Sequence, residues 1–211
     1  MLLQIAFDKP EHLGVLPLIR DVADIVEVGT PLLKRFGVSA ITTAREICPD
    51  VPVLADTKSV DGGTYEAEMV FGAGASFMTV LSCAPTATLA AVDACARRYE
   101  AAVVLDTITE TDEETLIYDG THLPDSFNYI ALHASTDTRL AGDASSRHIN
   151  AVASLRTRGF RVSLAGGIGP KNLDAAVAAG PDILVVGSAI TEAPNPLEMA
   201  SWIKKKLPQL T

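Results

Sequence analysis

The sequence has few cysteines and too little positive charge to balance its acidic residues. The three cysteines, Cys48, Cys83 and Cys95, are odd in number and far apart, so we expect no disulfide framework and no cysteine-bound metal. Lysine and arginine total 17 against 26 aspartates and glutamates, which gives a net charge of -9. Because a nucleic-acid partner requires a basic face, this balance argues against a nucleic-acid binder.

Long apolar segments are absent as well. The N-terminal run, residues 1–7, meets Asp8 and Lys9 too soon for a signal peptide. No stretch approaches the roughly 20 apolar residues that a membrane span requires. We therefore expect a cytoplasmic protein that does not bind a membrane. Hydrophobic residues make up 48% of the 211 residues and charged residues 20%, which is typical of one globular domain, here expected to span residues 1–211.

Short apolar runs alternate with longer amphipathic segments along the whole chain. The runs carry almost no charge and do not alternate with polar residues, a pattern typical of parallel strands covered on both faces. The expected strands are Leu3–Phe7, Ile25–Val28, Val53–Ala55, Phe77–Val80, Ala102–Leu105, Tyr129–Leu132, Val162–Ala165 and Ile183–Val186. Between them lie expected helices such as Pro85–Tyr99, in which apolar residues recur at helical spacing.

This alternation predicts a single (β/α)8 TIM barrel. An open doubly wound sheet built from the same elements is the alternative. No Gly-x-Gly-x-x-Gly follows the first expected strand, which favours the barrel. The most polar segment, Thr107–Asp125, is expected to form a helix with long loops.

Polar residues stand at the ends of the expected strands, where such barrels carry their chemistry. These residues are Asp8, Glu27, Asp56, Lys58, Asp61, Asp106 and His133. Three of them can instead be purely structural, since Asp8 can cap a helix, Asp106 can open a loop and His133 can be a satisfied core histidine. Glu27 is a stronger candidate because it lies within an apolar run, where an unpaired buried carboxylate is very costly.

The run Asp56-Thr57-Lys58-Ser59-Val60-Asp61 is the strongest signal of a site. In an extended strand Asp56 and Lys58 point to the same side, and Asp61 can approach from the following loop. Two carboxylates around one lysine keep its ammonium charged and hold it in place. A surface salt-bridge cluster is the alternative, although the preceding residues 53–55 have the character of a buried strand.

Two glycine turns follow the last two expected strands and indicate a phosphate site. Gly166 and Gly167 end one strand, and Gly187 and Ser188 end the other. Glycines let an anion approach the backbone N–H groups closely, and barrels of this kind often bind phosphate in these two loops. Tight turns without a ligand are the alternative.

Taken together, these residues resemble the orotidine-phosphate decarboxylase superfamily, whose mark is Asp-x-Lys-x-x-Asp at the end of the third strand. Within it the chain is most similar to the branch that contains 3-hexulose-6-phosphate synthase and 3-keto-L-gulonate-6-phosphate decarboxylase. The matching runs are Leu3–Asp8, Val26–Pro31, Leu54–Lys58, Ala165–Ile168 and Val186–Ile190. The similarity extends to the C-terminal helix and so covers nearly the whole chain.

The resemblance implies a metal-dependent reaction on a phosphorylated ketose. It implies Mg²⁺ held by Glu27 and Asp56, polarising the ketose carbonyl and stabilising an enediolate. Lys58 would add a fixed positive charge, and Asp61 would orient it from the partner subunit of a homodimer with active sites at the interface.

The resemblance also implies roles for residues around this centre. His133 would carry the proton, since its pKa suits acid–base work near neutrality. Asp8 would hold a substrate hydroxyl or Lys58. The expected substrate- and phosphate-binding residues are Gly166, Gly167, Gly187, Ser188 and Thr136.

Two reactions share the implied enediolate. A synthase adds formaldehyde to ribulose 5-phosphate, whereas a decarboxylase removes CO₂ from a keto-gulonate phosphate. The decarboxylase pattern has arginine where this chain has Thr136 and Ser188, which favours the synthase. The run His133–Asp137, however, also departs from the usual synthase form.

Two further functions are less well supported by the sequence. A non-catalytic phosphosugar-binding barrel is possible, although the acid–base set argues against it. A ribulose-phosphate epimerase needs two metal-binding histidines at strand ends. Only His133 lies at such an end, because His12, His122 and His148 fall in expected helices or loops.

Overall fold

The computed structural model describes residues 1–110, 123–137 and 146–208. Its strands are β1 (Leu2–Phe7), β2 (Ile25–Val28), β3 (Val53–Ser59), β4 (Phe77–Leu81), β5 (Ala102–Asp106), β6 (Phe127–His133), β7 (Arg161–Ala165) and β8 (Ile183–Val186). All neighbouring strands pair in parallel, and β1 also pairs with β8, which closes the barrel. The predicted (β/α)8 barrel is therefore confirmed, and the open sheet is excluded.

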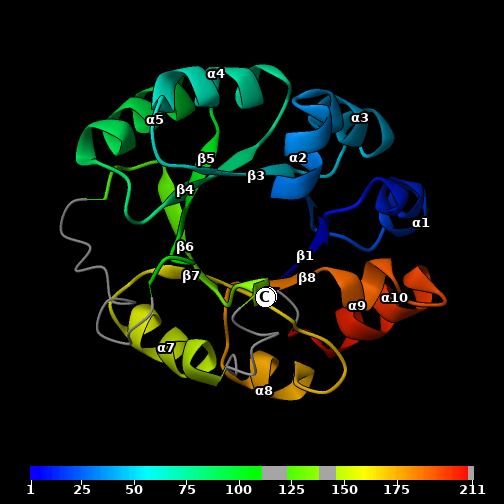
Figure 1. Ribbon diagram of the computed structural model, residues 1–211. Helices are drawn as coiled ribbons and strands as arrows, with labels where there is room; N and C mark the ends of the chain where they lie inside the picture. Colours follow the sequence, from blue (N-terminus) through cyan, green and yellow to red (C-terminus); the bar gives the residue numbers. More distant parts are fainter. Residues whose placement is uncertain (111–122, 138–145, 209–211) are drawn as a thin grey trace.

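Helices surround the ring of strands (Figure 1). They are the 3-10 helix η1 (Pro10–Val15), α1 (Leu16–Ile19), α2 (Thr30–Phe36), α3 (Ser39–Ile47), α4 (Gly63–Gly72), α5 (Thr86–Arg98), α7 (Ser146–Thr157), α8 (Leu173–Ala178), α9 (Ser188–Thr191) and α10 (Pro196–Lys206). Helix α5 confirms the helix expected over Pro85–Tyr99. The helix expected within Thr107–Asp125 would fall on residues 111–122, which lie outside the described residues, as does His122.

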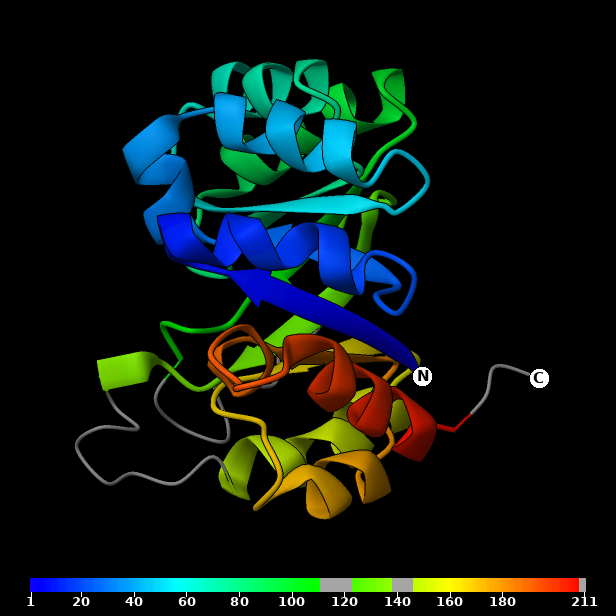
Figure 2. The same cartoon turned by 90° about the vertical axis from the view of Figure 1, so that its right-hand side faces the viewer.

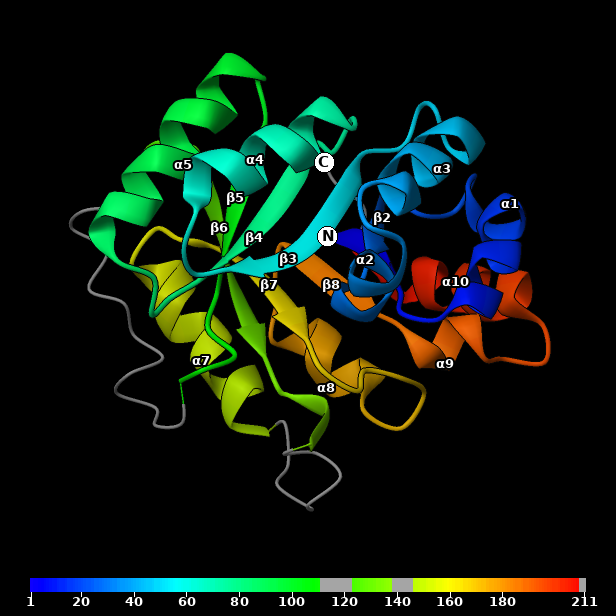
Figure 3. The same cartoon turned by 45° about the horizontal axis from the view of Figure 1, so that its top comes forward.

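Helices α4 and α5 lie side by side outside β3, β4 and β5 (Figure 3). Both ends of the described chain lie at the end of the barrel where the strands begin (Figure 2). There the amino group of Met1 donates a hydrogen bond to the carbonyl of Pro208 at 3.1 Å. No helix in the described ranges is long and apolar enough to cross a membrane.

The apolar side chains form two separate clusters whose members alternate along the strands. On β1, for example, Ile5 and Phe7 belong to the larger cluster and Ala6 to the smaller one. Since successive side chains of a barrel strand point outward and inward in turn, the larger cluster fills the space beneath the helices and the smaller one fills the barrel. The inward members are Ala6, Ile25, Leu54, Val104, Tyr129, Ala131, Ala165, Ile183 and Val185.

This alternation determines where the polar residues at the strand ends lie. Glu27 and Asp56 follow the inward residues Ile25 and Leu54 by two positions, and Asp106 follows Val104 in the same way. A shift of two residues along a strand keeps the same face. The three carboxylates therefore stand above the apolar filling of the barrel, at its mouth.

Candidate functional site

Lys58 lies at the centre of the barrel mouth. Its Nζ is 2.8 Å from Oδ1 and 2.7 Å from Oδ2 of Asp56, and 3.1 Å from Oδ2 of Asp106. Burial alone would lower the pKa of Lys58, but the charges and hydrogen bonds of Asp56 and Asp106 outweigh it and raise that pKa. Lys58 is therefore a fixed ammonium at neutral pH.

The backbone of Lys58 is strained. Its φ of 52° lies in the left-handed region, and the β3–β4 register shifts between Ala55 and Ser59. Such a conformation costs about 1–3 kcal/mol and persists only where the surroundings enforce it. Here Thr79 enforces it, because its Oγ1 accepts from the Lys58 N–H at 2.9 Å and its carbonyl accepts from Thr57 Oγ1 at 2.6 Å. The pairing with Asp56 therefore arises from a bulged strand rather than from the regular extended strand that the sequence predicts.

Asp56 is held by two hydroxyl groups besides Lys58. Thr30 Oγ1 donates to its Oδ2 at 2.8 Å, and Thr79 Oγ1 donates to its Oδ1 at 2.9 Å. A carboxylate offers about four acceptor positions, and in this arrangement Lys58 and the two threonines use them all. Asp56 is thus fixed in orientation.

Asp106 links Lys58 to His133. Its Oδ2 is 3.4 Å from His133 Nδ1, and its Oδ1 accepts from the Ile108 N–H at 2.9 Å. Burial would raise the pKa of Asp106 and lower that of His133, but their hydrogen bond and opposite charges reverse both shifts, so the pKa of Asp106 falls and that of His133 rises. The contact uses Nδ1, so Nε2 is the ring nitrogen available for proton transfer.

Glu27 has no cationic partner in the described part of the chain. It is 8% exposed, and its Oε2 accepts from Gln4 Nε2 at 2.6 Å. Burial, followed by the negative charge of Asp56, raises the pKa of Glu27 to about 8. Glu27 and Asp56 are therefore close enough to repel one another.

Glu27 and Asp56 are the carboxylates that could hold a divalent cation. Within the described ranges no three histidine, cysteine or acidic side chains form a metal-binding group, so the chain itself would supply two ligands. Hard cations such as Mg²⁺ often take one or two protein carboxylates and complete their shell from water or substrate. A cation beside Glu27 and Asp56 would cancel the repulsion and the burial cost that raise the Glu27 pKa.

Asp8 faces the same centre from the end of β1. Partial burial, and then the charge of Asp56, raise the pKa of Asp8. A side chain on the neighbouring Gly29 would not fit, because a Cβ there would lie 2.0 Å from Asp8 Oδ1. The Asp8 and Lys9 N–H groups lie 3.3 and 3.4 Å from Nδ1 of His12. Asp8 does not act here as the side-chain cap of a helix, since η1 has Lys9 as its N-cap.

The two glycine turns lie where the sequence predicts them. Gly166 has a φ of 110°, and a Cβ there would lie 2.6 Å from the Ala134 carbonyl, so only glycine fits. Gly187 precedes α9, which begins with the exposed Ser188, and Thr136 is exposed just after β6. Phosphate binding by these residues stays a prediction.

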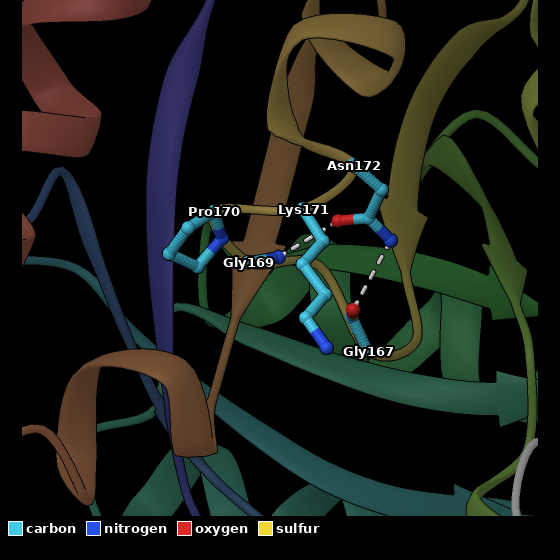
Figure 4. A pocket seen from close by; sticks show the side chains of 5 residues that line it. All are labelled: Gly167, Gly169, Pro170, Lys171 and Asn172. Carbon is cyan, nitrogen blue, oxygen red and sulfur yellow. Dashed lines mark hydrogen bonds between the residues drawn. The ribbon is translucent and has the colours of Figure 1, made fainter.

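An open pocket of about 380 Å³ adjoins the first turn. Its lining residues are Gly167, Gly169, Pro170, Lys171 and Asn172. The Asn172 side chain shapes it, since Oδ1 accepts from the Gly169 N–H at 2.9 Å and Nδ2 donates to the Gly167 carbonyl at 3.2 Å (Figure 4). Lys171 extends beside Gly167 in this view and forms no ion pair with the described residues. It is a cation next to the turn.

Asp61 does not join the other residues. It is exposed beyond the end of β3 and has no hydrogen bond or ion pair with the described residues. The second carboxylate at Lys58 is Asp106 instead, and Asp61 lies exposed beyond Ser59, the last residue of β3. Within one chain, the two carboxylates that contact Lys58 are therefore Asp56 and Asp106, and not Asp56 and Asp61 as the sequence suggested.

Four contributors were not identified from the sequence. They are Gln4, Thr30, Thr79 and Lys171. Gln4 and Thr79 carry the signal that identified Glu27, a polar residue within an apolar strand, but this signal is weak for neutral side chains. Lys171 could be found as the cation that follows the glycine turn.

Comparisons with known proteins identify the family and the fold. The sequence profile described as "Orotidine 5'-phosphate decarboxylase / HUMPS family" matches residues 1–203. The 3-hexulose-6-phosphate synthase structure from Salmonella typhimurium has a TM-score of 0.87 and 34% identity, covering 97% of both chains. A structure of KGPDC from Streptococcus mutans has a TM-score of 0.88 and 26% identity, covering 97% of this chain and 95% of that one.

Several curated relatives are longer. The "Bifunctional enzyme Fae/Hps" of Methanococcoides burtonii is 37% identical over 197 residues, which cover 90% of this chain and 49% of the relative. The chain thus spans about half the length of this relative and of two similar ones from Methanosarcina.

The raised pKa of Glu27 predicts a decline in stability with pH. The ordinary pKa of glutamate is 4.5, whereas that of folded Glu27 is about 8. Between these values the folded protein binds a proton that the unfolded chain has released, so the free energy of unfolding falls as pH rises, by on the order of 5 kcal/mol. Urea unfolding without divalent cations should show this fall.

Glu27→Gln should remove the part of the decline due to Glu27 and leave the part due to the raised pKa of His133. Glu46→Gln, at an exposed position on α3, is the matched control and should retain the full decline. An unchanged pH dependence in Glu27→Gln would contradict the buried, cation-free environment assigned to Glu27.

Proposed function

The chain belongs to the Orotidine 5'-phosphate decarboxylase / HUMPS family, and on that basis we propose that it is a lyase that joins formaldehyde and D-ribulose 5-phosphate to form 3-hexulose 6-phosphate. The observation that carries the proposal is the Asp106 carboxylate, which contacts Lys58 at 3.1 Å and His133 at 3.4 Å. It joins the Lys58 ammonium to the His133 imidazole. A cation beside a general base favours proton removal next to a carbonyl, which supports the proposal.

The substrate phosphate is proposed to bind at the two glycine turns, Gly166-Gly167 and Gly187-Ser188, with Thr136 and Lys171 beside them. The net charge of -9 would repel a phosphate from the protein as a whole. Local N–H groups and the Lys171 ammonium offset that repulsion. The sugar then extends from the β7 and β8 ends across the mouth toward Lys58.

His133 is proposed to move the proton. Its Nε2 accepts the proton from C1 of the ketose, and Asp106 stabilises the resulting imidazolium through Nδ1. The C1 carbon then attacks the carbon of formaldehyde, and the new hydroxyl oxygen takes the proton back from His133. The Lys58 ammonium stabilises the negative charge that develops on the ketose oxygen, and Asp8 accepts a hydrogen bond from a substrate hydroxyl.

Glu27 and Asp56 are proposed to hold Mg²⁺, which when bound polarises the ketose carbonyl. The 3-hexulose-6-phosphate synthases among the relatives support a metal-dependent enzyme. Thr30 and Thr79 orient Asp56 for this task. The Lys58 ammonium contacts both oxygens of Asp56, so it must yield some of this contact when a cation binds.

Decarboxylation of 3-keto-L-gulonate 6-phosphate is the second candidate. It would use the same residues, with His133 protonating the carbon that loses CO₂. The likeness to KGPDC favours it. Thr136 and Ser188 stand where the decarboxylase pattern has arginine, and neither can pair with a phosphate or carboxylate as a cation would.

A homodimer is proposed to complete the site with Asp61. Exposed apolar side chains lie near this residue in the sequence: Val60 precedes it, and Tyr65 and Met69 lie one turn apart on α4, with Tyr65 78% exposed. Exposed apolar residues gathered on one face are typical of an interface. A partner chain that covers α4 would bring its own Asp61 toward the mouth.

The main test is consumption of formaldehyde in the presence of D-ribulose 5-phosphate and Mg²⁺. Lys58→Met should lower kcat by roughly 10²–10³-fold, and His133→Gln by roughly 10²–10⁴-fold. Lys205→Met, an exposed position on α10, should leave the rate unchanged. Release of CO₂ from 3-keto-L-gulonate 6-phosphate without formaldehyde consumption would establish the second candidate. No turnover of either substrate would indicate a non-catalytic phosphosugar-binding barrel.

Mixing two inactive variants tests the shared site. Lys58→Met and Asp61→Asn should each be inactive alone. In a mixed dimer one site has Lys58 from one chain and Asp61 from the other. Refolding equal amounts together should therefore restore about a quarter of the unaltered activity, since half of the dimers are mixed and each has one intact site. No recovery, in a preparation that is shown to be dimeric, would rule out a site that shares Asp61.

A further inference from the structure

Gln4 is a polar side chain inside the barrel that the proposed mechanism does not use. It lies on β1, is 3% exposed, and pairs in register with Ile25 of β2 and Val185 of β8, both of which belong to the apolar filling of the barrel. An amide in such a place loses its contacts with water. Its position therefore calls for a specific partner.

Glu27 is that partner. The Gln4 Nε2 donates to Glu27 Oε2 at 2.6 Å. The Gln4 Oε1 is buried and has no hydrogen-bond partner among the described residues. An unsatisfied buried carbonyl is destabilising, so stability alone gives no reason for an amide at this position.

The contact with Gln4 leaves one of the two Glu27 carboxylate oxygens without a hydrogen bond from the described residues. Only Oε2 is engaged, and Glu27 Oε1 accepts no hydrogen bond in the described part of the chain. Asp56, the other proposed ligand, is already oriented by Thr30 and Thr79. Gln4 therefore orients the Glu27 carboxylate by a hydrogen bond, as the two threonines orient the Asp56 carboxylate.

We propose that Gln4 is a positioning residue that holds Oε2 of Glu27 and leaves Oε1 free to bind the divalent cation. The inference rests on the proposed function, because that function assigns the cation to Glu27 and Asp56. A glutamine suits this task because it donates a hydrogen bond without carrying charge. A lysine would neutralise Glu27 and compete with the cation, and a hydrocarbon would leave the carboxylate without orientation.

The test is direct binding of Mn²⁺, a probe for Mg²⁺, followed by the electron paramagnetic resonance signal of the free ion. Gln4→Met keeps the length of the side chain and removes the amide. It should weaken Mn²⁺ binding by roughly 10–100-fold, the usual effect of losing a group that orients a metal ligand. Binding of D-ribulose 5-phosphate without a cation should be unchanged, because the phosphate is held elsewhere.

Val185→Ala is the matched control. It loosens the barrel interior next to Gln4 without touching Glu27, so it should lower the melting temperature but leave Mn²⁺ affinity unchanged. Gln4→Lys serves as a second variant if Gln4→Met does not fold. Its ammonium can pair with Glu27, so it should retain the fold and lose Mn²⁺ binding.

The outcomes distinguish a failure of this inference from a failure of the proposed function. If the unaltered protein binds Mn²⁺ and Gln4→Met binds it equally well, Gln4 does not position Glu27. Equal weakening in Val185→Ala would also overturn the inference. If the unaltered protein binds no Mn²⁺, the assignment of the cation to Glu27 and Asp56 fails together with the inference.

Discussion

The contact of the Lys58 ammonium with the carboxylates of Asp56 and Asp106 is the interaction that holds the barrel mouth together. Both carboxylates are almost fully buried, 6% and 1% exposed, so each must have a cationic partner. Lys58 supplies one positive charge to both, and the His133 ring contacts Asp106 through Nδ1. Among the described residues Glu27 is left without a cationic partner, so burial and then the charge of Asp56 raise its pKa to about 8.

The strain at Lys58 follows from the same requirement. The register of β3 against β4 shifts between Ala55 and Ser59, and the left-handed φ of 52° sets Lys58 so that its side chain reaches carboxylates on two strands, β3 and β5. Thr79 holds this backbone and also orients Asp56. Strained backbone of this kind is concentrated at functional sites. The cost is therefore consistent with a proposed role in stabilising charge that develops on the substrate.

Much of this arrangement could be predicted because a parallel strand of a barrel leaves two signals in the sequence. Its apolar run gives the strand, and ionisable residues within or just after that run give the rim, which is how Glu27, Asp56, Lys58 and His133 were found together. Gln4 and Thr79 were missed because their inward direction is known only once the register of the closed barrel is known.

Asp61 shows the limit of local reasoning. Its spacing from Lys58 suggests closeness through the following loop, but β3 has its register shift before Ser59, where it ends, and Asp61 is exposed without a contact to Lys58. Within the chain, the carboxylate that contacts Lys58 is instead Asp106, 48 residues further along the sequence. The two residues can meet because only β4 lies between β3 and β5 in the barrel. Sequence spacing does not report such a contact. In the proposed dimer, the Asp61 side chain of one subunit would reach Lys58 of the other.

The proposed reaction begins when His133, held by Asp106 beside Lys58, removes a proton from C1 of a ketose phosphate. Proton NMR of D-ribulose 5-phosphate in D₂O, with the protein and Mg²⁺ but without formaldehyde, isolates this step. We expect one C1 proton to be exchanged for deuterium, and His133→Gln to abolish the exchange while the substrate still binds. Exchange at an unchanged rate in His133→Gln, or no exchange with the unaltered protein, would refute this role of His133.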